Sequence, residues 1–237
     1  MQLIKEHWNK NDVAEFQKYL LTFSKGTDAG SWEQRIVNTK LPCIAVSSPE
    51  VKRITKEIFK GNYFEFLDLW IWDNFTNTSI NGSIICKIKD FKVMESYLDK
   101  YINKCDNWAT CDLLKFPIKE DNKEQFFELS KKYIKSSKPF VRRAGITILF
   151  KFVDDDKYID QIFGLLNSFK DEEEYYVNMV NAWLVAECFT KQREKTLKFL
   201  KTHNLNKFTI NKAISKCRDS FRISNEDKDM LIKYRQK

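Results

Sequence analysis

A tryptophan and an aspartate stand four positions apart in the stretch D-N-W-A-T-C-D at residues 106–112. Asp106 or Asn107 can cap a helix that begins near Trp108, because short polar side chains accept hydrogen bonds from the first N–H groups of a helix. Trp108 and Asp112 then lie on one face of that helix. A carboxylate one turn from an indole is unusual in a core, because a buried charge needs a partner. The structural alternative is an inward Trp108 with a solvated Asp112 at the rim, and for this stretch taken alone it is the better interpretation.

Two adjacent arginines form a second candidate site. In K-P-F-V-R-R at residues 138–143, Arg142 and Arg143 fall in the first turn or so of a predicted helix. Cations at that end oppose the helix macrodipole. They are tolerated when an anion also lies there, either a carboxylate of the protein or a bound phosphate. Two solvated arginines are the structural alternative.

Trp183 is the third candidate, in a segment that is apolar nearly all round. Residues 175–189 predict a central helix covered on several sides. An indole in such a helix is ordinarily part of the core, so Trp183 alone indicates no function.

Most of the remaining chain carries apolar residues at helical spacing, with only 6 Gly and 4 Pro among 237 residues. Such counts are too low for an all-β protein with many tight turns. The pattern predicts a break at residues 25–30, a helix capped by Ser31 after it, and a further helix opened by S-S-P-E at residues 47–50. Other predicted helices include residues 64–72, 78–88, 91–102 and 124–134.

About a dozen helices are expected in antiparallel pairs, and the pairs begin roughly every 35 to 45 residues, a spacing typical of tandem helical repeats. The predicted fold class is therefore all-α, an α-solenoid. No change in composition marks a linker, so we expect one domain over residues 1–237.

The net charge of +8 gives only weak support for a polyanionic partner, because lysine, asparagine and isoleucine are all abundant. With two distant histidines and six cysteines lacking C-x-x-C spacing, we expect neither a zinc site nor a histidine-activated nucleophile. No glycine-rich phosphate loop, H-E-x-x-H or G-x-S-x-G occurs. No signal peptide or membrane span is predicted, so we expect a reducing, cytoplasmic location. We also expect no metal or other cofactor.

Three motifs resemble those of the DNA alkylation repair glycosylases built of HEAT-like helical repeats. They are W-A-T-C-D at residues 108–112, V-R-R-A at 141–144 and V-N-A-W-L at 180–184. V-S-S-P-E at residues 46–50 also aligns with the family, and the resemblance extends from about the first helix to Tyr234. Three motifs in register on a basic, all-helical chain are more specific than any one alone.

The resemblance implies HEAT-like antiparallel helix pairs with a concave, basic cleft that grips duplex DNA. It implies base excision repair, in which the N-glycosidic bond of cationic N3- or N7-alkylated purines is hydrolysed. By correspondence, Asp112 is the catalytic carboxylate, and Trp108 and Trp183 are the aromatic residues beside the deoxyribose. Arg143 corresponds to the arginine at the DNA backbone, with Arg142 as its neighbour. The expected partner is duplex DNA containing alkylated bases, bound by a monomer.

The chemistry suits these residue types. An alkylated purine is already cationic and can leave without a general acid, so such a site needs no histidine. As the glycosidic bond stretches, positive charge moves onto the sugar, where a carboxylate and aromatic faces stabilise it more in the transition state than in the ground state.

The chain departs from the family pattern at two positions. Ile36 occupies the position of a tyrosine that completes the aromatic cradle, and Ala45 that of a glycine before Pro-Glu. A non-catalytic helical-repeat protein that binds DNA, or a protein partner, through its concave face is therefore the alternative. Basic residues around Asp112 would favour DNA, and basic residues scattered on the convex side would favour a protein scaffold.

Overall fold

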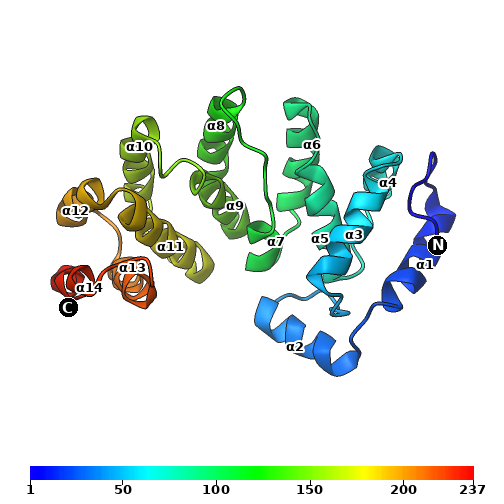
Figure 1. The fold of residues 1–237 in the computed structure, drawn as a ribbon, viewed down its shortest axis with the longest axis horizontal. Helices are drawn as coiled ribbons and strands as arrows, with labels where there is room; N and C mark the ends of the chain where they lie inside the picture. The colour runs from blue at the N-terminus through cyan, green and yellow to red at the C-terminus, as the bar shows by residue number, and fades with distance from the viewer. The chain divides into compact units, whose positions relative to one another are not determined.

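The computed structural model describes residues 1–237, which form fourteen α-helices and one 3₁₀ turn and no strand (Figure 1). The predicted all-α fold is confirmed. The helices belong to two compact units, Met1–Pro117 and Ile118–Lys237. Compactness does not establish independent folding, so the single domain over residues 1–237 stays a prediction. No helix is both long enough and apolar enough to cross a membrane.

The first unit contains α1 (Lys10–Leu21), α2 (Thr27–Val37), α3 (Ser48–Ile58), α4 (Tyr63–Asp68), α5 (Phe75–Ile85), α6 (Phe91–Ile102) and α7 (Trp108–Asp112). The second unit contains α8 (Lys123–Ile134), α9 (Pro139–Leu149), α10 (Asp156–Asn167), α11 (Tyr175–Lys191), α12 (Arg193–Thr202), α13 (Lys207–Asp219), α14 (Asn225–Leu231) and the 3₁₀ turn η1 (Ile232–Tyr234). Neighbours in sequence pack together, as α8 does with α9 and α11 with α12 (Figure 1).

Local signals predict several helix ends correctly. Ser47 is the N-cap of α3, with a proline in the first turn as expected. The bounds of α6 agree with the prediction, and Asp90 caps this helix by accepting a hydrogen bond from the Val93 N–H at 2.9 Å. Such caps depend on neighbouring residues alone, and the sequence therefore shows them.

The predicted break between two helices is present but lies at residues 22–26 instead of 25–30. Helix α2 begins at Thr27, directly after Gly26, so Ser31 lies inside the helix and does not cap it. Gly30 is present for packing: a Cβ there would lie 2.2 Å from the Cys43 carbonyl oxygen. The glycine allows the segment after α2 to fold back against the helix, a requirement that arises 13 positions further along the chain.

The predicted helix at residues 64–72 is too long. Helix α4 ends at Asp68, and Trp70 adopts a left-handed φ of 51°. A bulky residue with positive φ is rare and strained. The turn places the Trp70 and Trp72 rings in a parallel stack with centroids 5.6 Å apart, which offsets part of that cost.

Close packing around α5 positions α7. Gly82 lies where a Cβ would come within 2.5 Å of the Tyr101 hydroxyl and 2.9 Å of Leu113 Cδ1. The Tyr101 hydroxyl donates a hydrogen bond to the Thr78 carbonyl at 3.0 Å. This glycine-containing helix is therefore buried against its neighbours, and the end of α7 is one of them.

Ala45, the second departure from the family pattern, allows a test of backbone strain. Its φ of 50° is left-handed, a conformation that favours glycine, and its N–H donates to Glu33 Oε2 at 3.0 Å. We expect Ala45→Gly to raise the free energy of unfolding by about 0.5–1 kcal/mol, because relief of strain exceeds the added entropy of the unfolded chain. Urea unfolding measures the change. Ala14→Gly, at an exposed site inside α1, should instead lower the free energy of unfolding by about 1 kcal/mol. Equal effects at both positions would show that Ala45 is not strained.

Candidate functional site

The α7 helix presents the first pair of candidate residues. Asn107 is buried and caps the helix, since its Oδ1 accepts hydrogen bonds from the Thr110 N–H at 2.8 Å and hydroxyl at 2.9 Å. The cap predicted at Asp106 or Asn107 is therefore Asn107. Trp108 and Asp112 are both partly exposed, while Cys111 points into the core. An inward, core tryptophan is thus excluded at position 108.

A hydrogen bond to α2 fixes the Trp108 ring. Its indole N–H donates to the Ile36 carbonyl at 3.2 Å. Ile36 lies in the last turn of α2, where carbonyls have no partner within the helix. The indole therefore satisfies an acceptor that the helix leaves open. Position 36, which the resemblance assigns to the family tyrosine, therefore lies next to Trp108.

Asp106 holds the same two elements together. Its carboxylate accepts the Thr39 hydroxyl at 2.8 and 2.9 Å and the Lys40 N–H at 2.8 Å. The sequence suggested only a capping role for this residue, because no local signal points to a partner 67 positions away. Together with the indole bond, the carboxylate joins the end of α2 to the start of α7.

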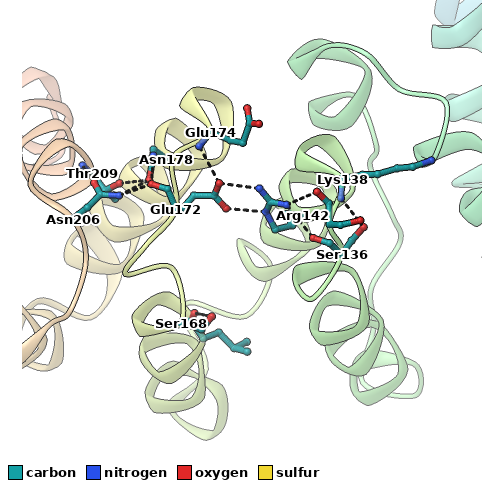
Figure 2. Close-up of polar contacts among 11 residues, drawn as sticks. Ser136, Lys138, Arg142, Ser168, Glu172, Glu174, Asn178, Asn206 and Thr209 are labelled. Carbon is teal, nitrogen blue, oxygen red and sulfur yellow. Dashed lines mark hydrogen bonds and ion pairs between the residues drawn. The ribbon is translucent and has the colours of Figure 1, made fainter.

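In the second unit, Arg142 is held by protein acceptors. Its Nε and Nη2 donate to the two carboxylate oxygens of Glu172, both at 2.8 Å (Figure 2). Its Nη1 donates to the Ser136 and Ser137 carbonyls at 3.0 and 2.9 Å. Of the anions expected beside this arginine, the one present is a carboxylate, and solvated exposure of Arg142 is excluded.

Glu172 also begins a polar chain toward α13 (Figure 2). Its backbone carbonyl accepts the side-chain amides of Asn178 and Asn206, each at 2.9 Å. Asn178 Oδ1 in turn accepts from the Asn206 amide at 3.0 Å and from the Thr209 hydroxyl at 2.6 Å. The first turns of α9, α11 and α13 are therefore linked by hydrogen bonds.

Arg143 is 5% exposed and donates from Nη1 to the Tyr176 carbonyl at 2.6 Å, in the first turn of α11. Positive charge gathers around it. Burial lowers the pKa of Lys216 on α13, and the nearby charges of Lys212 and Arg143 lower it further. Packing of α9 and α13 against α11 brings these three cations together.

Trp183 is not a core residue. It is 39% exposed, and it is the only exposed residue of α11 between Tyr176 and Thr190. Its ring packs against Phe150 with centroids 4.4 Å apart. The core interpretation is wrong because one narrow stripe of α11 is uncovered, with Met179 and Glu187 one turn to either side of Trp183. Glu187 on this stripe pairs with both terminal nitrogens of Arg222, at 2.9 and 2.6 Å.

The candidate residues thus form two groups. Trp108 and Asp112 share α7 of the first unit, whereas Arg142, Arg143 and Trp183 lie on α9 and α11 of the second. No group of three or more His, Cys, Asp or Glu side chains could hold a metal ion. All six cysteines are free thiols.

Comparison with known families gives one result. The sequence model of a family described as DNA alkylation repair enzyme matches residues 1–217. The chain belongs to the DNA alkylation repair enzyme family. No curated protein matches it at a significant level. Membership of the DNA alkylation repair enzymes supports a role in the repair of alkylated DNA, and it agrees with the resemblance carried by the three motifs.

In this DNA alkylation repair protein, the Arg142–Glu172 pair gives a test of stability. Arg142→Met leaves a nearly buried carboxylate without its partner, so we expect it to lower the free energy of unfolding by about 3–5 kcal/mol. The double variant Arg142→Met, Glu172→Gln removes both charges and should recover part of that loss. Urea unfolding of Arg142→Met, Glu172→Gln and the double variant measures the coupling energy in a double-mutant cycle. Additive single losses would show that the pair has no coupling.

Proposed function

We propose that this protein is a DNA glycosylase of base excision repair, which hydrolyses the N-glycosidic bond of cationic N3- or N7-alkylated purines in duplex DNA. The observation that carries the proposal is the partly exposed carboxylate of Asp112 one turn from Trp108, whose ring is fixed by the Ile36 carbonyl. Membership of the DNA alkylation repair enzymes supports the same reaction.

In the proposed reaction the glycosidic bond breaks before water has fully attacked. The bonding electrons move to the purine nitrogen and neutralise the alkylated base, so no acid is needed for its departure. Positive charge develops on the deoxyribose, where the Asp112 carboxylate and the Trp108 ring face stabilise it. Trp183 stays a predicted catalytic residue on the strength of the resemblance. The oxygen of a water molecule then bonds to C1′, and the proton that the water loses is accepted by Asp112 or by solvent.

We further propose that Arg143, Lys212 and Lys216 bind the DNA backbone. The charges of Lys212 and Arg143 disfavour the charged form of Lys216, and a nearby phosphate would act in the opposite direction. The net charge of +8 also supports a polyanionic partner. Arg142 stays a predicted DNA-binding residue, and its bonds to Glu172 and the Ser136 carbonyl support a role in positioning its neighbour Arg143.

Non-catalytic DNA binding is the second candidate function. The observation that favours it is Ile36 beside Trp108, where an aliphatic side chain replaces an aromatic ring and can stabilise a cation only weakly. A protein scaffold is less favoured, because family membership indicates a DNA substrate.

Four further properties stay predictions: HEAT-like repeats, a concave cleft, a monomeric state and a cytoplasmic location.

The catalytic role of Asp112 is tested by incubating the protein with duplex DNA that contains 7-methylguanine and measuring free base released in a single turnover. Asp112→Asn retains shape but loses the charge, so we expect at least a tenfold slower release, or about 1.4 kcal/mol of lost transition-state stabilisation. Asp121→Asn, at an exposed turn, is the control. Wild-type release by a folded Asp112→Asn variant would refute the catalytic assignment, and no release by the wild-type protein would leave non-catalytic binding.

The proposed backbone contact predicts a steep loss of affinity for undamaged duplex DNA with rising salt, because bound cations release counterions from phosphates. Lys212→Gln should weaken binding to all sequences alike and reduce the slope of log K against log salt by roughly one unit. Fluorescence anisotropy at several salt concentrations measures both quantities. Lys198→Gln on α12 is the charge-matched control. A slope unchanged by Lys212→Gln would remove this lysine from the interface.

A further inference from the structure

Helix α2 presents two large apolar side chains to solvent. Trp32 is 60% exposed and Ile36, one turn later, is 53% exposed. Gly30 and Val37 are buried, so the opposite side of α2 makes the contacts that hold it in the first unit. The Trp32 ring makes no aromatic contact and its N–H donates no hydrogen bond. The fold therefore gains little from this tryptophan.

The exposed pair is continuous with the candidate site. Ile36 accepts the Trp108 indole through its carbonyl, so its own side chain lies at the edge of the surface that carries Trp108. Trp32 precedes Ile36 by four residues and shares its face of the helix. We call Trp32, Ile36 and Trp108 the apolar strip.

The charges around the strip indicate its partner. Arg35 lies on the same exposed face, and Lys25 and Lys40 are exposed just before and after α2. Asp28 is the one exposed acid on the helix. An apolar strip bordered mainly by cations is complementary to duplex DNA, whose sugars and base edges lie between lines of phosphates. An acid-bordered strip would instead have favoured a basic protein.

We propose that Trp32 and Ile36 contact the DNA beside the alkylated nucleotide and extend the surface of Trp108 along the duplex. Four residues of helix rise about 6 Å, which is close to two base-pair steps of 3.4 Å each. Trp32 therefore lies against a neighbouring base or sugar and not against the reacting sugar. It is a DNA-binding residue that adds affinity beside the site and does not contact the reacting sugar. This role rests on the proposed function.

The experiment compares Trp32→Ala, Trp32→Phe and Leu21→Ala with the wild-type protein. Leu21 is an exposed apolar residue of the same unit, at the end of α1. Affinity for a duplex with one 7-methylguanine is measured together with single-turnover release of the base at saturating protein. Loss of the apolar area that the indole buries against DNA should weaken binding at least fivefold in Trp32→Ala. Trp32→Phe should restore most of it, and Leu21→Ala should bind as wild type.

At saturating protein, release by Trp32→Ala should stay within about threefold of wild type, because the residue adds affinity and does not contact the reacting sugar. Its melting temperature should be unchanged, because it supports no core. The proposal is overturned if Trp32→Ala binds with wild-type affinity or if Leu21→Ala weakens binding to the same extent. It is also overturned if the loss of affinity in Trp32→Ala comes with a lowered melting temperature. If the wild-type protein binds duplex but releases no base, and Trp32→Ala still weakens binding, the glycosylase proposal fails and the contact stands. If the wild-type protein binds no duplex, both fail.

Discussion

The hydrogen bond from the Trp108 indole to the Ile36 carbonyl joins the two elements on which the first part of the site depends. Helix α7 has only five residues, too few to be stable by itself. Its geometry must therefore come from outside: the Asn107 cap, the carboxylate of Asp106 on the end of α2, and the packing of Leu113 over Gly82. A short helix held in this way can present a tryptophan and an aspartate to solvent in a fixed orientation.

The second unit achieves a similar result with a longer helix. Helix α11 is buried on most sides, and its conformation is set by packing against α9 and α13. One stripe stays uncovered, and Trp183 lies in the middle of it. The helix can present an exposed indole at little cost because its other faces already supply the burial that stabilises it. In both units, therefore, the accessible aromatic residues lie on elements that other contacts hold rigid.

The sequence predicts the parts of this structure that depend on near neighbours. The all-α class, the bounds of α6 and the cap of α7 follow from periodicity and short polar side chains. The sequence does not show which distant residues meet: Gly30 with the segment after α2, Asp106 with Thr39, and Glu172 with Arg142. Periodicity alone favours a core position for Trp183, because it shows that a helix is mostly apolar but not which narrow face its neighbours leave open.

The two departures from the family pattern have different physical consequences. Ala45 retains the left-handed backbone that a glycine would adopt more easily, and the Glu33 carboxylate holds its N–H in place. The local backbone therefore survives this change at a modest cost in stability. Ile36 alters no backbone, since its carbonyl still accepts the indole, but it changes the side chain offered to a ligand. An aliphatic group cannot stabilise a cation as a ring face does. The hydrogen bonds of the backbone are therefore in place at both positions, and the departure at Ile36 concerns the side chain alone.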